Sequence, residues 1–163
     1  VYKRQDNMNA GGLRYGEDFG IPAVAISLPD SVSKLEQRTM HENLIHDTLM
    51  NYDIELVVLS GYMRILTSTF VSKWKGRLIN IHPSLLPKYP GANAHRDALA
   101  DGANITGCTV HLVDEGVDTG EIIAQEEVEI LDGDTIEELQ ERVKKIEHQL
   151  YPKVLDTFCS KGV

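Results

Sequence analysis

The sequence predicts an α/β fold whose sheet is parallel at least through its first three strands. Short apolar runs alternate along the chain with segments whose apolar residues recur at helical intervals. Unbroken apolar runs are typical of parallel strands, which are buried on both faces. The chain has 163 residues, 42% of them hydrophobic, and a chain of this length buries enough surface for a core. We therefore expect a single domain over residues 1–163.

Strand and helix patterns alternate from the beginning of the chain. Residues 13–19 follow a polar, glycine-rich opening and have weak helical character. The apolar run Ile21–Leu28 ends at a proline and predicts the first strand. Asp30 or Ser31 can cap the helix after it, because both side chains accept hydrogen bonds from free backbone N–H groups. The next apolar run, Leu56–Leu59, predicts the second strand.

The middle of the chain contains a third strand pattern and a long connection. Thr67 can cap a short helix, and Leu78–His82 predicts a strand that Pro83 stops. Residues 83–93 contain three prolines and lead to a short helix at Ala94–Leu99. So rigid a connection is more typical of a functional loop than of a flexible linker.

The last third of the chain predicts two strands and one long helix. The strands span Gly107–Val113 and Glu121–Glu129. Asp134 can cap the helix, in which apolar residues recur at intervals of three and four. Pro152 is expected to end or kink that helix, because proline lacks a backbone N–H.

Composition and charge argue against several classes of function. The 25 Asp and Glu residues outnumber the 16 Lys and Arg residues, and a net charge of −9 disfavours binding to nucleic acid or anionic membranes. No apolar run reaches the ~18 residues of a membrane span, so we expect a cytoplasmic protein. Cys108 and Cys159 fit neither a disulfide framework nor a metal site and are expected to be free thiols.

Asn80 and His82 are the first candidate catalytic residues. They stand two apart at the end of the third predicted strand, so both lie on one face and Ile79 and Ile81 on the other. A carboxamide can stabilise an oxyanion, and an imidazole can stabilise it or move protons near neutral pH. The pair suits acyl transfer to an amine. The alternative is an Asn and a His that only satisfy backbone groups.

An acidic turn, Asp114–Gly120, joins the last two predicted strands. One of its carboxylates is expected to reach the imidazole of His82 and orient it. The alternative is a solvated hairpin, and the spacing of its carboxylates does not match a calcium loop. His95 and His111 do not complete a metal site with His82, because no fourth ligand stands at a suitable spacing. We expect no metal.

The segment Gly61–Leu66 follows the second predicted strand, where glycine permits a sharp turn. Its arginine could meet a carboxylate, and its apolar side chains could line a slot for a ligand. By itself the segment is equally compatible with an ordinary elbow between a strand and a helix.

Five segments together resemble the folate-dependent formyltransferases, in which they occur in the same order. The resemblance extends from about Ala10 to Val154. It implies a Rossmann-like, mostly parallel, twisted sheet with helices on both faces. Gly91–His95 and Glu147–Pro152 narrow it to the phosphoribosylglycinamide formyltransferase branch. The five segments are Gly61–Leu66, Ile79–Pro87, Gly91–His95, Gly107–His111 and Val117–Gly120.

The resemblance also implies an activity, the transfer of a formyl group from 10-formyltetrahydrofolate to the amine of glycinamide ribonucleotide. It implies catalytic roles for Asn80, His82 and Asp118 and no metal. Its partners would be these two small molecules, without nucleic acid or membrane, and a homodimer is compatible with it. The residues implied to bind formyl folate are Arg38, Met63, Arg64, Ile65, Leu66, Asn80, Asp114, Glu115, Gly116, Val117 and Asp118, and those implied to bind the ribonucleotide are Lys144 and Glu147.

The beginning of the chain departs from the family pattern. Family members open with a strand and a Gly/Ser-rich turn that binds the substrate phosphate through backbone N–H groups. Here Gly11 and Gly12 do not follow an apolar strand, and Val1–Gln5 does not resemble the family. We therefore expect an N-terminally truncated chain that binds the ribonucleotide weakly.

Three other functions stay open. A formyltetrahydrofolate deformylase would use a similar arrangement of residues to transfer the formyl group to water. A methionyl-tRNA formyltransferase would need a basic RNA-binding domain, whereas this chain is acidic. A noncatalytic folate-binding module would bind the folate without transferring its formyl group.

Overall fold

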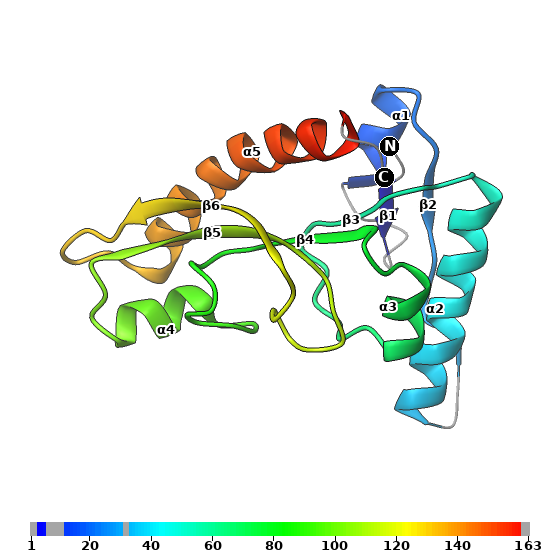
Figure 1. Ribbon diagram of the computed structural model, residues 1–163, viewed down its shortest axis with the longest axis horizontal. Helices are drawn as coiled ribbons and strands as arrows, with labels where there is room; N and C mark the ends of the chain where they lie inside the picture. Colours follow the sequence, from blue (N-terminus) through cyan, green and yellow to red (C-terminus); the bar gives the residue numbers. More distant parts are fainter. Residues whose placement is uncertain (1–2, 6–11, 31–32, 161–163) are drawn as a thin grey trace. The chain divides into compact units, whose positions relative to one another are not determined.

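The computed structural model describes residues 3–5, 12–30 and 33–160. The chain divides into two compact units, Val1–Ile54 and Glu55–Val163 (Figure 1). The expectation of one domain over the whole chain stays a prediction. Among the described helices, none is both long enough and apolar enough to cross a membrane.

Within its described residues, 3–5, 12–30 and 33–54, the first unit has two short strands and two helices. β1 (Lys3–Gln5) runs parallel to β2 (Ala23–Ala25), and α1 (Gly12–Asp18) stands between them in the chain. Gly16 of α1 lies so close to β2 that a Cβ atom there would stand 2.5 Å from the Cβ of Ala23. This close approach explains a glycine inside a helix, where it is otherwise unfavourable. α2 (Lys34–Asn51) completes the unit.

Several expectations for this unit need correction. The N-cap of α2 is Ser33 and not Asp30, because the Ser33 hydroxyl accepts a 3.1 Å hydrogen bond from the backbone N of Glu36. The other predicted cap, Ser31, lies outside the described residues, as does Gly11. The first predicted strand is shorter, Ala23–Ala25, and β1 stands where the sequence has no apolar run. A strand held by backbone pairing to a single neighbour needs no such run.

The second unit is built on a four-stranded sheet in the order β3-β4-β5-β6 (Figure 1). β3 (Val57–Leu59) and β4 (Leu78–His82) are parallel, as predicted. β5 (Ile105–Leu112) pairs antiparallel with β4 and with β6 (Ile122–Glu129). The turn between β5 and β6 is too short for the crossover that parallel strands require, so the two form a hairpin. The α/β class is confirmed, with a mixed sheet in this unit.

The core of this unit lies between the sheet and helix α5 (Ile136–Ser160). Ile79 of β4 and Val110 of β5 are fully buried there. Because side chains alternate along a strand, Asn80 and His82 point to the opposite face of β4. The predicted division of the third strand between an apolar and a polar face is therefore present.

The shorter helices of this unit begin close to their predicted positions. α3 (Ser68–Lys73) is capped by Thr67, whose hydroxyl accepts a 3.3 Å hydrogen bond from the backbone N of Phe70, as predicted. α4 (Ala94–Ala100) follows the proline-rich loop.

Helix α5 departs from the prediction at both ends. Thr135 and Glu138 close its first turn, since each side chain accepts a hydrogen bond from the backbone N of the other. Asp134 does not cap the helix but binds Arg142 through both carboxylate oxygens. Pro152 lies inside the helix and does not end it. The turns beyond Pro152 pack against the core, and this packing compensates for the missing backbone hydrogen bond.

Candidate active site

A cavity of about 940 Å³ opens in the second unit where β3 and β4 end. Its walls are the segment after β3, the end of β4, the loop before α4, the turn between β5 and β6 and one face of α5. Ligands of α/β sheets bind at the carboxyl ends of strands. The volume suits a cofactor-sized molecule.

Strand β4 brings Asn80 and His82 to the wall of this cavity. In the antiparallel register of β4 and β5, Asn80 stands opposite His111 and His82 stands opposite Thr109. Residues directly opposite each other share a face of the sheet. The sheet therefore places the polar side chains of two neighbouring strands together.

His82 makes one hydrogen bond and one ion-pair contact through its two ring nitrogens. Nδ1 lies 3.3 Å from Oδ2 of Asp118, and Nε2 lies 2.8 Å from the carbonyl oxygen of Tyr89. A carbonyl oxygen cannot donate, so Nε2 carries the proton of this bond, and the Asp118 carboxylate lies where it can pair with a positive charge on the ring. The side chain is 6% exposed. When it is protonated at both nitrogens, His82 offers a ligand a positive charge at the cavity wall.

Asp118 reaches His82 from the turn between β5 and β6. Its φ of +55° is in the left-handed region, which Asp and Asn adopt more readily than most residues. Oδ2 also accepts a 2.8 Å hydrogen bond from the backbone N of Gly91. Asp114 closes the same turn by accepting a 2.8 Å hydrogen bond from the hydroxyl of Thr119. One carboxylate oxygen of Asp118 therefore connects the turn, the imidazole and the loop before α4.

His111 fixes the orientation of the Asn80 amide. Nδ1 of His111 lies 2.9 Å from the carbonyl oxygen of Leu112, so Nδ1 carries a proton. In the neutral ring, Nε2 then accepts a hydrogen bond from Nδ2 of Asn80, 3.3 Å away. One N–H of Asn80 is used in this way, and the second stays available to a ligand.

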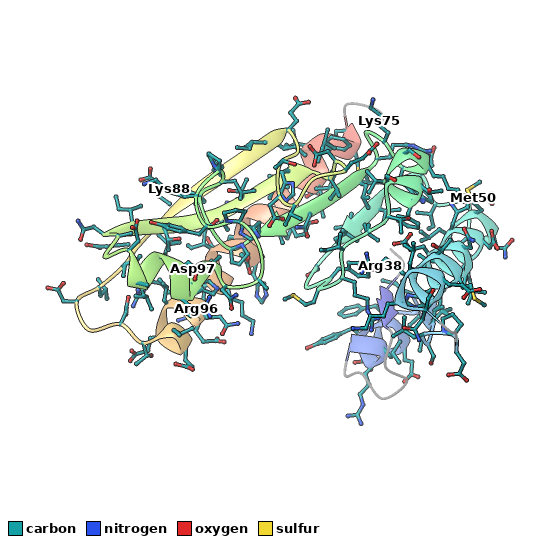
Figure 2. All side chains as sticks on the ribbon, turned by 90° about the horizontal axis from the view of Figure 1, so that it is seen from below. Arg38, Met50, Lys75, Lys88, Arg96 and Asp97 are labelled. Carbon is teal, nitrogen blue, oxygen red and sulfur yellow. The ribbon has the colours of Figure 1, made fainter. Side chains whose placement is uncertain are left out.

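Most residues implied to bind formyl folate line this cavity. Glu115 lies on the same turn but not in the wall. Arg38 lies on α2 of the first unit, and its role stays a prediction (Figure 2). The residues in the wall are Met63, Arg64, Ile65, Leu66, Asn80, Asp114, Gly116, Val117 and Asp118.

Helix α5 contributes Lys144 and Glu147 to the wall, and their role in binding the ribonucleotide stays a prediction. Burial raises the pKa of Glu147, and the charges of nearby His148, His82 and Lys144 act in the opposite direction. His148 and Tyr151 line the cavity as well, although sequence reasoning does not assign them. Their helical spacing from Lys144 is the signal that could have found them.

Among the described residues, no group of three or more His, Cys, Asp or Glu side chains is arranged so that it could hold a metal ion. Cys108 and Cys159 are free, as predicted. Burial raises the pKa of the Cys108 thiol to about 12, which keeps it unreactive at neutral pH.

A family model described as formyl transferase matches residues 2–155. The expectation that Val1–Gln5 falls outside the resemblance is therefore wrong for residues 2–5. Unlike the later segments, Val1–Gln5 has no distinctive residue pattern, and its polar residues form the short strand β1.

Curated relatives include the "Trifunctional purine biosynthetic protein adenosine-3" of Chironomus tentans, 49% identical over 149 residues, and that of Homo sapiens, 46% identical over 153. The matches cover 91% and 93% of this chain but only 11% and 15% of those relatives. The chain thus spans a small part of their length. The phosphoribosylglycinamide formyltransferase of Bacillus subtilis is 42% identical over 150 residues, which are 92% of this chain and 75% of that protein.

Solved structures agree with these relatives. The phosphoribosylglycinamide formyltransferase from Bacillus halodurans aligns with a TM-score of 0.90 at 38% identity, covering 100% of this chain and 82% of that one. The enzyme of the same name from Brucella melitensis aligns with a TM-score of 0.86 at 44% identity, covering 97% and 79%.

Proposed function

Because the chain belongs to the formyl transferase family, we propose that it transfers the formyl group of 10-formyltetrahydrofolate to the amine of glycinamide ribonucleotide, a step of purine biosynthesis. The observation that carries the proposal is the contact between His82 and Asp118, with Asn80 beside them, in a cavity of cofactor size. The names of the similar proteins support this choice of formyl acceptor.

The reaction begins when the amine nitrogen attacks the formyl carbon and the carbonyl electrons move onto the formyl oxygen. Asn80 donates its remaining N–H to this oxyanion, and the charge of His82 stabilises it. Both effects are stronger than in water, because little solvent reaches the buried side of the cavity to screen them.

The tetrahedral intermediate collapses when the bond between the formyl carbon and the folate nitrogen breaks. The electron pair stays on the folate nitrogen, which takes up a proton, and the attacking amine loses one. In the proposed mechanism a water held by Asp118 passes this proton from one nitrogen to the other. The step needs neither a metal nor a covalent enzyme intermediate.

The two substrates enter from different walls. The exposed side chains of Met63 and Ile65 offer the folate an apolar surface after β3. The ribonucleotide binds on the side of α5, where Lys144 offers a cation and Glu147 a hydrogen-bond acceptor. The amine and the formyl carbon then meet beside Asn80.

Measuring tetrahydrofolate release with and without glycinamide ribonucleotide tests the proposal. We expect release only when the ribonucleotide is present, together with an equal amount of formylated ribonucleotide detected by mass spectrometry. Release at the same rate in its absence would instead identify a deformylase. Folate binding without any release would identify a noncatalytic module.

A further inference from the structure

Three side chains hold the loop between β4 and α4 (Figure 1). This loop supplies the Tyr89 carbonyl that accepts the hydrogen bond from Nε2 of His82. Its backbone forms neither a strand nor a helix, so its polar groups need partners outside regular secondary structure. Ser84 of the loop, Thr109 of β5 and Gln125 of β6 provide such partners, and we call these three residues the loop clamp.

Thr109 is the centre of the loop clamp. It is fully buried and stands opposite His82 in the register of β4 and β5. Its hydroxyl donates a 2.6 Å hydrogen bond to the carbonyl oxygen of Ser84 and accepts one of 3.0 Å from the backbone N of Leu86. Nε2 of Gln125 donates to this hydroxyl at 2.8 Å and to the carbonyl oxygen of Leu86 at 2.9 Å. The first residues of the loop are therefore bound to two strands of the sheet.

Ser84 extends these contacts to the residue beside His82. The side chain of Ser84 is fully buried. Its hydroxyl donates a 2.6 Å hydrogen bond to the carbonyl oxygen of Lys88 and lies 3.3 Å from the carbonyl oxygen of Tyr89. The same oxygen of Tyr89 lies 2.8 Å from Nε2 of His82. The Ser84 hydroxyl thus fixes the peptide group that precedes Tyr89 and contacts the acceptor of His82.

Tyr89 has a backbone conformation that needs such support. Its φ of +54° is in the left-handed region, which is rare for a bulky side chain. A residue keeps such a conformation only where surrounding contacts impose it. The carbonyl before Tyr89 bonds to Ser84, and its own carbonyl bonds to His82. Without the Ser84 hydroxyl, we expect Tyr89 to relax and its carbonyl oxygen to move away from Nε2 of His82.

We propose that the loop clamp positions His82, with Ser84 as the positioning residue nearest to the ring. The inference rests on the proposed formyl transfer, in which the charge of His82 stabilises the oxyanion. Ser84 is not part of the cavity wall, so it acts through the Tyr89 carbonyl. A ring that turns from its acceptor stabilises the transition state less, whereas the surfaces that bind the substrates stay in place. Loss of the Ser84 hydroxyl should therefore lower kcat and leave KM nearly unchanged.

Two variants of Ser84 and one matched control test this role. Ser84→Ala removes the hydroxyl, and Ser84→Thr keeps it. Ser72→Ala is the control, because the Ser72 hydroxyl also donates a hydrogen bond to a backbone carbonyl, that of Thr69, but on α3. We expect Ser84→Ala to lower kcat about 10- to 10²-fold with KM values within about twofold of the wild type, since a small misplacement near the reacting atoms costs turnover. Ser84→Thr should recover most of this loss, and Ser72→Ala should match the wild type.

A variant of Gln125 keeps the proposal testable if Ser84→Ala does not fold. Gln125 is exposed, and Gln125→Met removes both of its donated hydrogen bonds without altering the core. We expect kcat to fall about threefold to tenfold, less than in Ser84→Ala because water can replace part of these bonds. Glu127→Gln, an exposed change on the same strand, should have no effect.

Melting curves show which of these variants are folded. A folded Ser84→Ala protein with kcat within about twofold of the wild type, or with a KM that rises as much as kcat falls, overturns the proposal. If Ser84→Ala does not fold, an unchanged kcat in Gln125→Met overturns it instead.

A measurement on the ring separates this inference from the proposed function. NMR detects the proton on Nε2 of His82 whether or not the protein transfers formyl groups. This proton is bonded to the Tyr89 carbonyl and should exchange slowly with solvent in the wild type. We expect its exchange to be at least about tenfold faster in Ser84→Ala and unchanged in Ser72→Ala. Equal exchange in Ser84→Ala and the wild type would contradict the inference, whereas slow exchange in a wild type that fails to transfer formyl groups would contradict the proposed function alone.

Discussion

The imidazole Nδ1 of His82 lies 3.3 Å from Oδ2 of Asp118, and the same oxygen accepts a hydrogen bond from the backbone N of Gly91. A strand end, a hairpin turn and a proline-rich loop thus meet at one carboxylate. The Nε2 of the same ring bonds to Tyr89, on that loop. His82 is held from both sides by segments far apart in the sequence, so its orientation depends on each of them.

Asp118→Asn tests the carboxylate. An amide keeps the shape of the side chain but removes the negative charge beside His82, which leaves the ring cation without its partner. We expect kcat for formyl transfer to fall about 10²- to 10⁴-fold, the range typical of lost acid–base groups. The Kd of the folate, measured by calorimetry, should change far less.

Asp97→Asn is the matched control for this change, because Asp97 lies on α4 and pairs with Arg96 at the surface. Its turnover should equal that of the wild type. An Asp118→Asn protein with turnover within threefold of the wild type would show that the His82–Asp118 contact has no part in catalysis.

Asn80→Ala tests the oxyanion donor. The Asn80 amide lies between His111 and the cavity, and alanine removes its N–H from the cavity wall. We expect kcat to fall about 10²- to 10³-fold with little change in folate affinity, since the bond is made mainly in the transition state. A fall in affinity as large as the fall in turnover, measured by calorimetry and steady-state kinetics, would instead assign Asn80 to ground-state binding.

The sequence predicts those parts of this site that depend on local pattern. β4 occupies the residues predicted for it, because alternating apolar residues end at a proline and no competing pattern overlaps them. The face shared by Asn80 and His82 follows from the same alternation. The acidic composition of the turn between β5 and β6 predicts that one of its carboxylates contacts His82. In the structure, the turn places Asp118 beside His82.

The features that the sequence does not predict depend on contacts between segments that are far apart in the chain. Pro152 is a strong local stop signal, yet α5 continues past it because its last turns pack against the core. The carbonyl of Tyr89 beside His82 is a backbone group in a loop, so no residue type marks it. The spacing of residues in the sequence does not predict that Nδ1 of His95 lacks a hydrogen-bond partner among the described residues either. That feature results from burial in the fold and not from a sequence motif.

Tyr89→Phe tests whether the proline-rich loop positions His82. The Tyr89 hydroxyl donates a 2.6 Å hydrogen bond to Asp101 at the end of α4, and this bond raises the pKa of Tyr89. Without it the loop is less restrained, and the carbonyl that holds Nε2 of His82 is free to move. We expect kcat to fall about threefold to tenfold while the KM values stay constant, because a small misplacement near the reacting atoms costs turnover.

Asp101→Asn is the companion variant for this bond. Asparagine still accepts a hydrogen bond from the Tyr89 hydroxyl through its amide oxygen, so its effect should be smaller than that of Tyr89→Phe. Equal turnover in the wild type and Tyr89→Phe would show that the hydrogen bond between Tyr89 and Asp101 does not position His82.

Asp134→Asn tests stability through a pH-dependent ion pair. Hydrogen bonds of 2.6 and 2.7 Å from Arg142, and one from the backbone N of Leu131, lower the pKa of Asp134 to about 2. The folded-state pKa is below the ordinary value near 3.9, so the carboxylate stabilises the fold above about pH 4 and ceases to do so as the pH falls through about 2. The urea midpoint of unfolding should therefore be lower for Asp134→Asn than for the wild type at pH 6, and this gap between the two midpoints should shrink between pH 4 and pH 2.

Asp132→Asn is the control, because Asp132 is an exposed residue on the same turn. It should leave the urea midpoint unchanged at every pH. A gap that stayed constant down to pH 2 would mean that the loss comes from packing and not from the charge of Asp134.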